Sequence, residues 1–166
     1  MRIRDEHLYH GAALNQIAEH KKFTAINTLK VKGKVSRSAF RINAQTDVYL
    51  KYARKPAGKF KEYQFTFTKE HRAELKNIVG AGGDLYIVLV CVRDKHICCI
   101  TYQEFENLLE ARRTSAGRVE AQFVILVTLR PGEAFRAYVN SPGKRGKFLK
   151  PKLKIPRNRF PESVVR

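Results

Sequence analysis

The stretch LYIVLVCVRDKHICCI, residues Leu85–Ile100, decides the fold. Its first part, Leu85–Val92, is almost continuously apolar and rich in Val, Leu and Ile, which is typical of a strand covered on both faces. The polar residues Arg93–His96 then turn the chain into a second apolar run, Ile97–Ile100. We therefore predict a β-hairpin in the core of the protein.

Three cysteines lie in this hairpin. With a tight turn, Cys91 is expected opposite Cys98 on the neighbouring strand. An odd number of thiols cannot all pair within the chain, and no Cys-x-x-Cys spacing offers a zinc site. We therefore predict reduced cysteines, Cys99 included, that pack the core as small apolar side chains.

Helix signals lie on both sides of the hairpin. Thr101 and Glu104 have the spacing of a capping box, which predicts that a helix begins there. Thr68 is expected to cap another helix that runs to about Val79, before a glycine-rich stop. A third helix is predicted from Asp5 to His20, with Asp5 as its N-cap.

The remaining ordered segments have the patterns of strands. Phe23–Asn43 is β-branched and basic and predicts one or two strands. Thr46–Tyr52 and Tyr63–Phe67 alternate between apolar and polar residues, and we expect them to pair as a hairpin. Gln122–Leu129 and Phe135–Val139 form another hairpin. The predicted fold class is α+β, a mixed and largely antiparallel β-sheet with about three α-helices.

The length of 166 residues fits one domain that buries a core without disulfides or metal. We place a single α+β domain at residues 1–140. Residues 141–166 form a basic extension that contains Pro and Gly and packs on the domain. The apolar residues expected to hold it there are Phe148, Leu153, Ile155 and Phe160.

The charge of the chain is its strongest functional signal. Lys and Arg number 33 against 15 Asp and Glu, so the formal net charge is +18. Repulsion of this size opposes a compact state unless anions are close, and a nucleic-acid backbone is the most common polyanionic partner. The other explanation is that the charge only keeps the protein soluble.

Membranes and secretion fit the sequence poorly. The longest apolar runs fall well short of the ~20 residues that a membrane-spanning helix needs. The chain has no basic amphipathic helix and no lipidation motif, and Met1–Glu6 leads into no secretory signal. We expect no membrane partner and a cytoplasmic location.

Basic residues gather in three parts of the chain: Lys30–Arg37, Lys51–Lys61 and the C-terminal extension. Each is predicted to form a loop or a strand edge, where Lys and Arg can contact phosphates. Phe60 lies among the cations of the second part, so we predict that it stacks on the bases of a single strand. The residues predicted to bind nucleic acid are Lys51, Arg54, Lys55, Lys59, Lys61, Lys144, Arg145, Lys147, Lys150, Lys152, Lys154, Arg157 and Arg159.

Three polar residues form a second candidate site. Asp47 lies on one predicted strand, and Glu62 and Gln64 lie on the next. Two carboxylates on paired strands can hold a divalent metal ion, which would activate water and stabilise charge at a scissile phosphate. This arrangement predicts Asp47 and Glu62 as metal ligands.

The order helix, strand, Asp-bearing strand, Glu-x-Gln strand, helix, strand resembles the PD-(D/E)xK restriction-endonuclease-like fold over roughly the first hundred residues. The resemblance implies Mg²⁺ as cofactor and Asp47, Glu62 and Gln64 as catalytic residues, with Gln64 where a Lys is usual. Thr46 stands where the family has Pro, and the missing Lys puts activation of the attacking water in doubt. The fold without catalysis is the other reading of the resemblance.

The sequence therefore predicts a protein that binds DNA or RNA through phosphate contacts made by a basic surface. The first alternative is a divalent-metal-dependent nuclease of the PD-(D/E)xK type. The second is a basic adaptor that binds an acidic protein partner. The choice between DNA and RNA, the target and the oligomeric state stay open.

Overall fold

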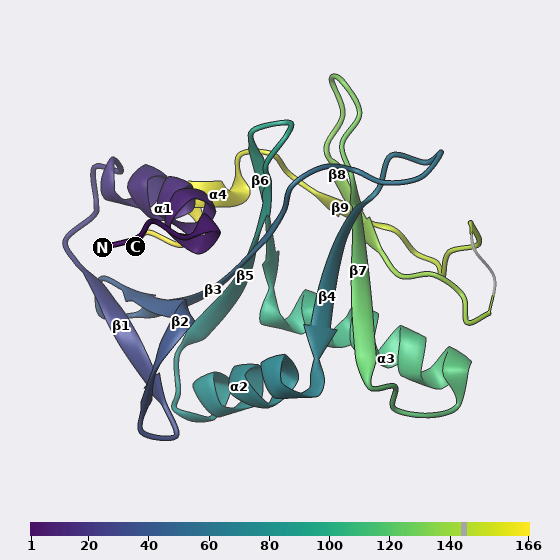
Figure 1. The fold of residues 1–166 in the computed structure, drawn as a ribbon, viewed down its shortest axis with the longest axis horizontal. Helices are drawn as coiled ribbons and strands as arrows, with labels where there is room; N and C mark the ends of the chain where they lie inside the picture. Colours follow the sequence, from purple (N-terminus) through teal and green to yellow (C-terminus); the bar gives the residue numbers. More distant parts are fainter. Residues whose placement is uncertain (144–145) are drawn as a thin grey trace.

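The chain folds into an α+β structure with two β-sheets and four helices (Figure 1). This computed structural model describes residues 1–143 and 146–166, and these counts refer to those residues. The predicted fold class is confirmed, and one short helix, α4 (Arg159–Glu162), is added to the three expected. No helix in the described ranges is both long enough and apolar enough to span a membrane.

The first sheet has five strands in the order β1-β2-β3-β5-β6. Neighbouring strands are antiparallel except β3 and β5, which run parallel because β4 and α2 return the chain between them. The predicted hairpin of Leu85–Ile100 is confirmed as β5 and β6. The strands are β1 (Ile26–Val31), β2 (Lys34–Ile42), β3 (Thr46–Ala53), β5 (Asp84–Cys91) and β6 (His96–Thr101).

The second sheet has four antiparallel strands in the order β4-β7-β8-β9. Strands β7 and β8 form the hairpin predicted between Gln122 and Val139. Strand β9 comes from the C-terminal segment and completes the edge of the sheet. The strands are β4 (Tyr63–Thr68), β7 (Gln122–Thr128), β8 (Phe135–Tyr138) and β9 (Leu153–Ile155).

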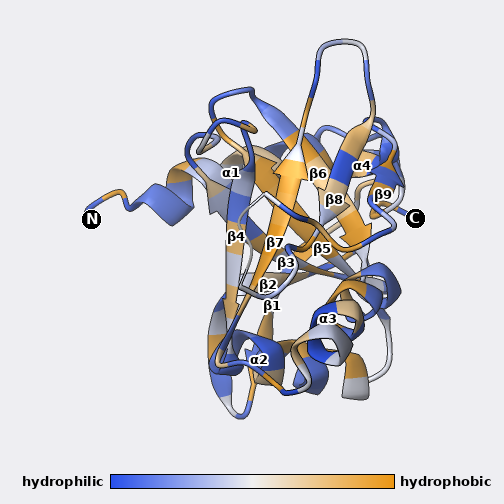
Figure 2. Ribbon diagram, turned by 90° about the vertical axis from the view of Figure 1, so that its right-hand side faces the viewer, coloured by the Kyte–Doolittle hydropathy of each residue, from blue (hydrophilic) through white to orange (hydrophobic). Residues whose placement is uncertain are grey.

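The first core lies between the two sheets. Phe65 and Phe67 of the second sheet and Leu89 of the first are buried in it. Helices α2 (Lys69–Gly80) and α3 (Tyr102–Ala116) lie side by side at one end of both sheets (Figure 1). Apolar residues concentrate on the central strands, whereas α2 and α3 also present polar residues (Figure 2).

The second core lies on the other face of the first sheet, where α1 (Asp5–Ala18) and α4 cover the strands (Figure 1). Val48 and Leu50 of β3 and Val88 of β5 pack there with Ile17 of α1. Strand β5 is thus covered on both faces. This double burial explains why its sequence is almost continuously apolar.

Two of the predicted helix starts are confirmed. The side-chain oxygen of Thr101 accepts the Glu104 N–H at 3.0 Å, and the Glu104 carboxylate accepts the Thr101 N–H at 2.9 Å. This reciprocal pair is the predicted capping box of α3. Thr68 caps α2 as predicted, whereas the N-cap of α1 is Arg4, one residue before the predicted Asp5.

The predicted hairpin between Thr46–Tyr52 and Tyr63–Phe67 is wrong. Strand β3 lies between β2 and β5, whereas β4 belongs to the second sheet and pairs with β7. Strand β3 is buried along most of its length, so it needs a neighbour on each side and cover on each face. The apolar stripe of β4 instead covers the far side of the first core.

The predicted pairing of Cys91 with Cys98 is also wrong. Cys98 lies opposite Leu89 and Cys91 lies opposite His96, because the turn comprises Val92–Lys95, one residue earlier than the sequence suggested. The three cysteines are free and buried, as predicted. Burial in the apolar interior raises the pKa of each thiol.

The C-terminal segment, residues 141–166, contributes to both cores. Ile155 of β9 is fully buried in the first core, and Phe160 and Val164 are buried in the second. The segment therefore supplies core side chains in addition to the surface contacts expected from the sequence.

Phe160→Ala is expected to lower the free energy of unfolding by about 3–5 kcal/mol, because the lost ring leaves a cavity in the second core. Phe148→Ala makes the same change in the same segment at a side chain that is 37% exposed, against 6% for Phe160. We expect this control to lower the free energy of unfolding by only about 1–2 kcal/mol, because the substitution removes less buried apolar area. Urea unfolding of both variants measures the difference, and equal effects would show that Phe160 is not a core residue.

Candidate nucleic-acid interface

The outer face of the second sheet, opposite the first core, carries the candidate interface. Gln64 of β4 and Val124 of β7 point to this face and are exposed. Leu126 and Tyr138 point the same way but are buried. Polar and apolar surface are therefore mixed on this face.

A groove of about 750 Å³ lies over this face, and we call it the sheet groove. Gln64, Val124 and Leu126 form its floor. One side is the connection from β3 to β4, and the other is the segment that follows β8. The residues that line these sides are Ala57, Gly58, Lys59, Phe60 and Glu62 on the first, and Val139, Asn140 and Gly146 on the second, with Arg112 of α3 and Gln122 of β7 at the end of the groove.

Two of the three basic segments singled out in the sequence, Lys51–Lys61 and the C-terminal extension, contact each other at the sheet groove. A Cβ atom placed on Gly146 would lie 2.9 Å from Cε2 of Phe60, so the ring packs directly against the glycine backbone. Phe60 nevertheless remains 50% exposed. The amine of Lys59 lies 5.1 Å from the centre of the ring. Phe60 therefore presents an aromatic surface beside a cation, the arrangement that base stacking would need.

Backbone hydrogen bonds shape the loop that carries Phe60. Ala57 and Glu62 form an antiparallel bridge, with N–H to O distances of 2.8 and 3.1 Å. Gly58 and Lys61 adopt positive φ angles of 70° and 53° inside that bridge. The loop therefore turns tightly and places its cations on its exposed tip.

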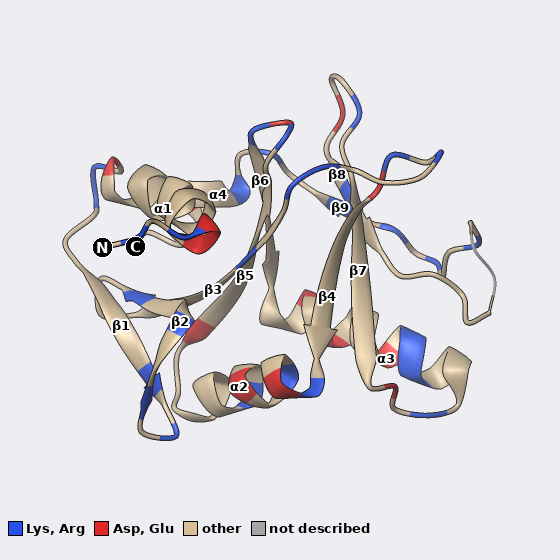
Figure 3. Cartoon of the chain, viewed as in Figure 1, with Lys and Arg blue, Asp and Glu red and all other residues tan. Residues whose placement is uncertain are grey.

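Lys and Arg mark the β3–β4 connection and the segment after β8, which approach the second sheet (Figure 3). The basic cluster Lys30–Arg37 instead forms the β1–β2 hairpin, at the other side of the molecule. Six of the lysines predicted to bind phosphates are exposed and form no ion pair among the described residues. They are Lys55, Lys59, Lys61, Lys147, Lys150 and Lys154.

Other predicted phosphate ligands are engaged within the protein. Arg54 pairs with Asp5. Arg157 donates to the carbonyl oxygens of Glu133 and Arg130 at 2.6 and 2.7 Å. Arg159 is bonded to Glu104 and to the Cys99 carbonyl. Lys144 and Arg145 lie outside the described residues.

Lys152 is held by two aromatic rings on the outer face. Its amine lies 4.2 Å from the centre of the Tyr138 ring and 4.0 Å from that of Phe148. The Tyr138 hydroxyl donates a hydrogen bond to Glu62. Burial, and then this carboxylate, raise the pKa of Tyr138. These contacts of Lys152 and Phe148 with Tyr138 hold the segment after β8 against the second sheet.

Lys51 differs from the exposed predicted ligands because it is half-buried against other side chains of the fold. Its amine is 3.3 Å from Nδ1 of His71 and 4.9 Å from the centre of the Phe67 ring. The same Nδ1 accepts the Thr68 N–H at 3.2 Å, so this nitrogen carries no proton. Desolvation lowers the pKa of Lys51 to about 8. Lys51 is therefore a half-buried amine on β3, away from the sheet groove.

The proposed metal ligands do not meet in the structure. Asp47 is 1% exposed on the first sheet, and both of its carboxylate oxygens accept hydrogen bonds from Arg41, at 2.8 and 3.1 Å. This bond raises the pKa of Arg41. Glu62 and Gln64 lie at the second sheet, where Glu62 binds Tyr138. These side chains do not fit a shared Mg²⁺, and no cluster of three acidic, His or Cys ligands occurs among the described residues.

Sequence reasoning missed Arg112, which joins three segments at the end of the sheet groove. Its guanidinium donates to both oxygens of Glu120, at 2.5 and 2.9 Å, and to the Asn140 carbonyl at 2.7 Å. The bond with Glu120 raises the pKa of Arg112 and lowers that of Glu120. The sequence shows only a polar residue on a helix, because both of its partners come from other segments.

Comparisons with known proteins give no further guidance: no protein-family model, curated protein or solved structure matches this chain.

Lys51→Met is expected to raise the free energy of unfolding near neutral pH, because it removes a half-buried charge that the fold desolvates. Lys51 has a folded pKa of about 8, below its ordinary value of 10.5. Between these two pH values the unfolded chain therefore binds more protons than the folded protein. The free energy of unfolding of wild type then rises with pH over this range, because of Lys51. The advantage of the variant should shrink from pH 8 to 10.5 in urea unfolding. Lys55→Met, at an exposed site, is the control, and a constant advantage for Lys51→Met would refute the assignment.

Asp47→Ala is expected to lower the free energy of unfolding by about 1.5–3 kcal/mol, the usual effect of losing hydrogen bonds to a charged group. Asp84→Ala removes an exposed carboxylate that pairs with Arg166. This control should cost less than about 1 kcal/mol. Thermal unfolding of both variants compares them, and an unchanged Asp47→Ala protein would show that the buried ion pair is not structural.

Proposed function

We propose that the protein binds single-stranded nucleic acid along the sheet groove. The contact between Phe60 and Gly146 carries the proposal, because it joins the two basic segments around one hollow. Lys59 lines the groove, and the other five exposed lysines lie on the same two segments beside it, where they can contact phosphates of a longer strand. Phe60 supplies a stacking surface for a base. The net charge of +18 attracts any polyanion to this surface at long range.

A single strand fits this surface better than a duplex. The floor offers exposed apolar surface at Val124 and an amide group at Gln64, and Gln122 adds a second amide at the end of the groove. These groups suit the faces and edges of unpaired bases. In a duplex the base faces are stacked on one another, and Phe60 could not reach them. Phosphate contacts by lysine give affinity with little sequence preference.

Binding is expected to depend steeply on salt. The logarithm of the association constant, plotted against the logarithm of the salt concentration, falls with a slope of about −0.7 for each phosphate contact to a single strand. Six lysines therefore give a slope of about −4. Phe60→Ala should weaken binding by about 5- to 150-fold, the effect of losing one stacked base, and leave the slope unchanged. Lys59→Ala and Lys147→Ala should each reduce the slope by about 0.7. Fluorescence anisotropy with labelled DNA and RNA strands measures all three.

Matched controls separate the groove from general charge. Lys21→Ala removes an exposed cation from the far side of the molecule and should leave the slope unchanged, and Phe60→Tyr should preserve stacking. An affinity that does not change with salt concentration, or an equal affinity for single strands and duplexes, would refute the proposal. Cleavage of the strand that requires Mg²⁺ and stops with chelator would favour a nuclease instead. Binding to acidic peptides that single strands do not displace would favour a protein partner.

A further inference from the structure

The hairpin of β1 and β2 has a strongly basic tip, on the side of the molecule away from the sheet groove (Figure 3). We call residues 30–37 the basic hairpin. Its exposed cations are Lys30, Lys32, Lys34 and Arg37. None of them forms an ion pair among the described residues. These four cations are therefore close together along the chain, and no carboxylate is bound to any of them.

A tight turn holds these cations on a regular two-stranded ribbon. Lys32 and Gly33 adopt φ angles of 50° and 78°, and Val31 pairs with Lys34 around them. Positive φ at both central residues is typical of the turn whose twist matches that of the strands it joins. Lys34 points to the same face as its partner Val31, whereas Lys30 points to the other face. The basic hairpin therefore presents cations on both faces and at its tip.

Two carboxylates line a hollow of about 480 Å³ between the basic hairpin and α2. They belong to Glu70 and Glu74. Glu74 accepts hydrogen bonds from the hydroxyl of Ser36 and, at 3.4 Å, from that of Tyr49. Glu70 is therefore the carboxylate of this lining that remains to offset the cations of the hairpin.

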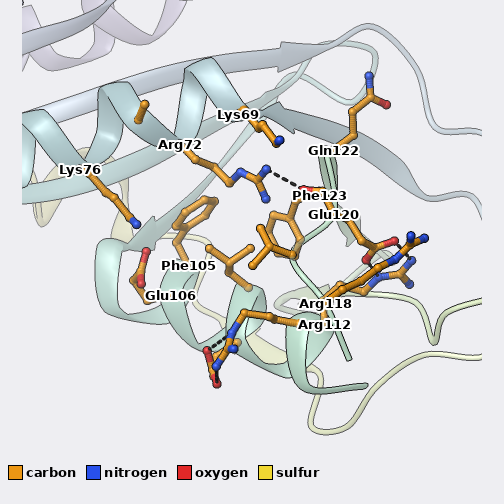
Figure 4. Close-up of a pocket in the computed structure, with 15 residues that line it drawn as sticks. Lys69, Arg72, Lys76, Phe105, Glu106, Arg112, Arg118, Glu120, Gln122 and Phe123 are labelled. Carbon is orange, nitrogen blue, oxygen red and sulfur yellow. Dashed lines mark hydrogen bonds and ion pairs between the residues drawn. The ribbon is translucent and has the colours of Figure 1, made fainter. Parts of the chain in front are cut away.

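Helix α2 also carries positive charge. On its side facing α3 it borders a hollow of about 430 Å³, towards which Lys69, Arg72 and Lys76 extend (Figure 4). Lys69 and Lys76 are exposed. The helix thus has three cations against two carboxylates. It does not neutralise the basic hairpin beside it.

The basic hairpin has no ring on which a base could stack. Phe40 is the aromatic residue of β1 and β2, and it is half-buried against the second core. Val35 is 55% exposed and is the large apolar side chain at the tip, which is little for insertion into a membrane surface. Contacts to phosphates remain, and they need no unpaired bases. A duplex suits such contacts, because it carries one negative charge per ~1.7 Å of its axis.

We propose that the basic hairpin binds the phosphate backbone of a nucleic-acid duplex. The sheet groove lies at the other side of the molecule, so one protein can hold a single strand in the groove and a duplex on the hairpin together. This bridging rests on the proposed function, whereas the duplex contact does not. A strand held beside a duplex meets it at a raised effective concentration.

Salt dependence of duplex binding tests the hairpin contact. Each phosphate contact to B-DNA contributes about −0.9 to the slope, so Lys32→Gln/Lys34→Gln should make the duplex slope less steep by about 1.8. At physiological salt this corresponds to duplex binding about 10- to 30-fold weaker. The slope for a short single strand should not change. Fluorescence anisotropy with labelled duplex and single strand measures both.

A matched control keeps the same net charge. Arg93→Gln/Lys95→Gln removes two exposed cations from the turn between β5 and β6 and should leave both slopes unchanged. All four substituted side chains are exposed, so both variants should unfold thermally as wild type does. A duplex slope that is the same in Lys32→Gln/Lys34→Gln and wild type would overturn the inference.

A biotinylated duplex on beads tests the bridge. Wild type should retain on the beads a labelled single strand that is not complementary to the duplex. Lys32→Gln/Lys34→Gln should lose this retention because it leaves the duplex, whereas Phe60→Ala should lose it because it releases the strand and still binds the duplex. Exclusion of one nucleic acid by the other would overturn the bridge.

The two measurements distinguish failure of this inference from failure of the proposed function. If wild type binds single strands but no duplex, the basic hairpin is not an interface and the sheet groove stands. If poly-glutamate displaces the duplex as effectively as an equal charge of unlabelled duplex, an acidic protein fits the hairpin equally well and the inference is overturned. If wild type binds duplexes through the hairpin but no single strand, the proposed function fails and the hairpin contact stands.

Discussion

The burial of β5 on both faces is the constraint on which the rest of the structure depends. Apolar side chains leave this strand in both directions, so one layer of structure must cover each face. Helices α1 and α4 cover one face, and the second sheet covers the other. The second sheet then has one face in the core and one at the surface. The sheet groove occupies the surface face, so the candidate interface follows from how the centre of the molecule is covered.

Local sequence signals predicted most elements, because their causes lie within a few residues. The capping box at Thr101 and the apolar run of β5 needed no information from elsewhere in the chain. Strand pairing failed where it depended on distant segments, since alternation identifies the apolar face of β4 but not its neighbour. The prediction for Asp47 was wrong for the same reason. The sequence pattern assigned Asp47 to an exposed face, whereas its strand is buried on both sides and Arg41 neutralises the carboxylate.

The candidate site was predictable in its chemistry but not in its geometry. The sequence identified Phe60 and the exposed lysines, because cations and aromatic residues can be counted in a chain. It could not show that Phe60 packs on Gly146, which is distant in the sequence, or that Lys51, Arg157 and Arg159 are occupied by internal contacts. The hollow of about 430 Å³ between α2 and α3 could not be predicted for a related reason: its lining comes from two helices, the α3–β7 connection and a strand, which only the tertiary fold brings together.

The segment after β8 belongs to both the surface and the interior. It forms one side of the sheet groove and then contributes to both cores through β9 and α4. Any ligand held against this side also holds the chain that fills those cores. A ligand that binds the assembled groove more tightly than the unfolded chain draws the folding equilibrium towards the native protein by mass action. Self-repulsion among 33 basic side chains falls at the same time, as the ligand neutralises part of them. Occupancy of the surface and integrity of the interior are therefore thermodynamically linked in this protein.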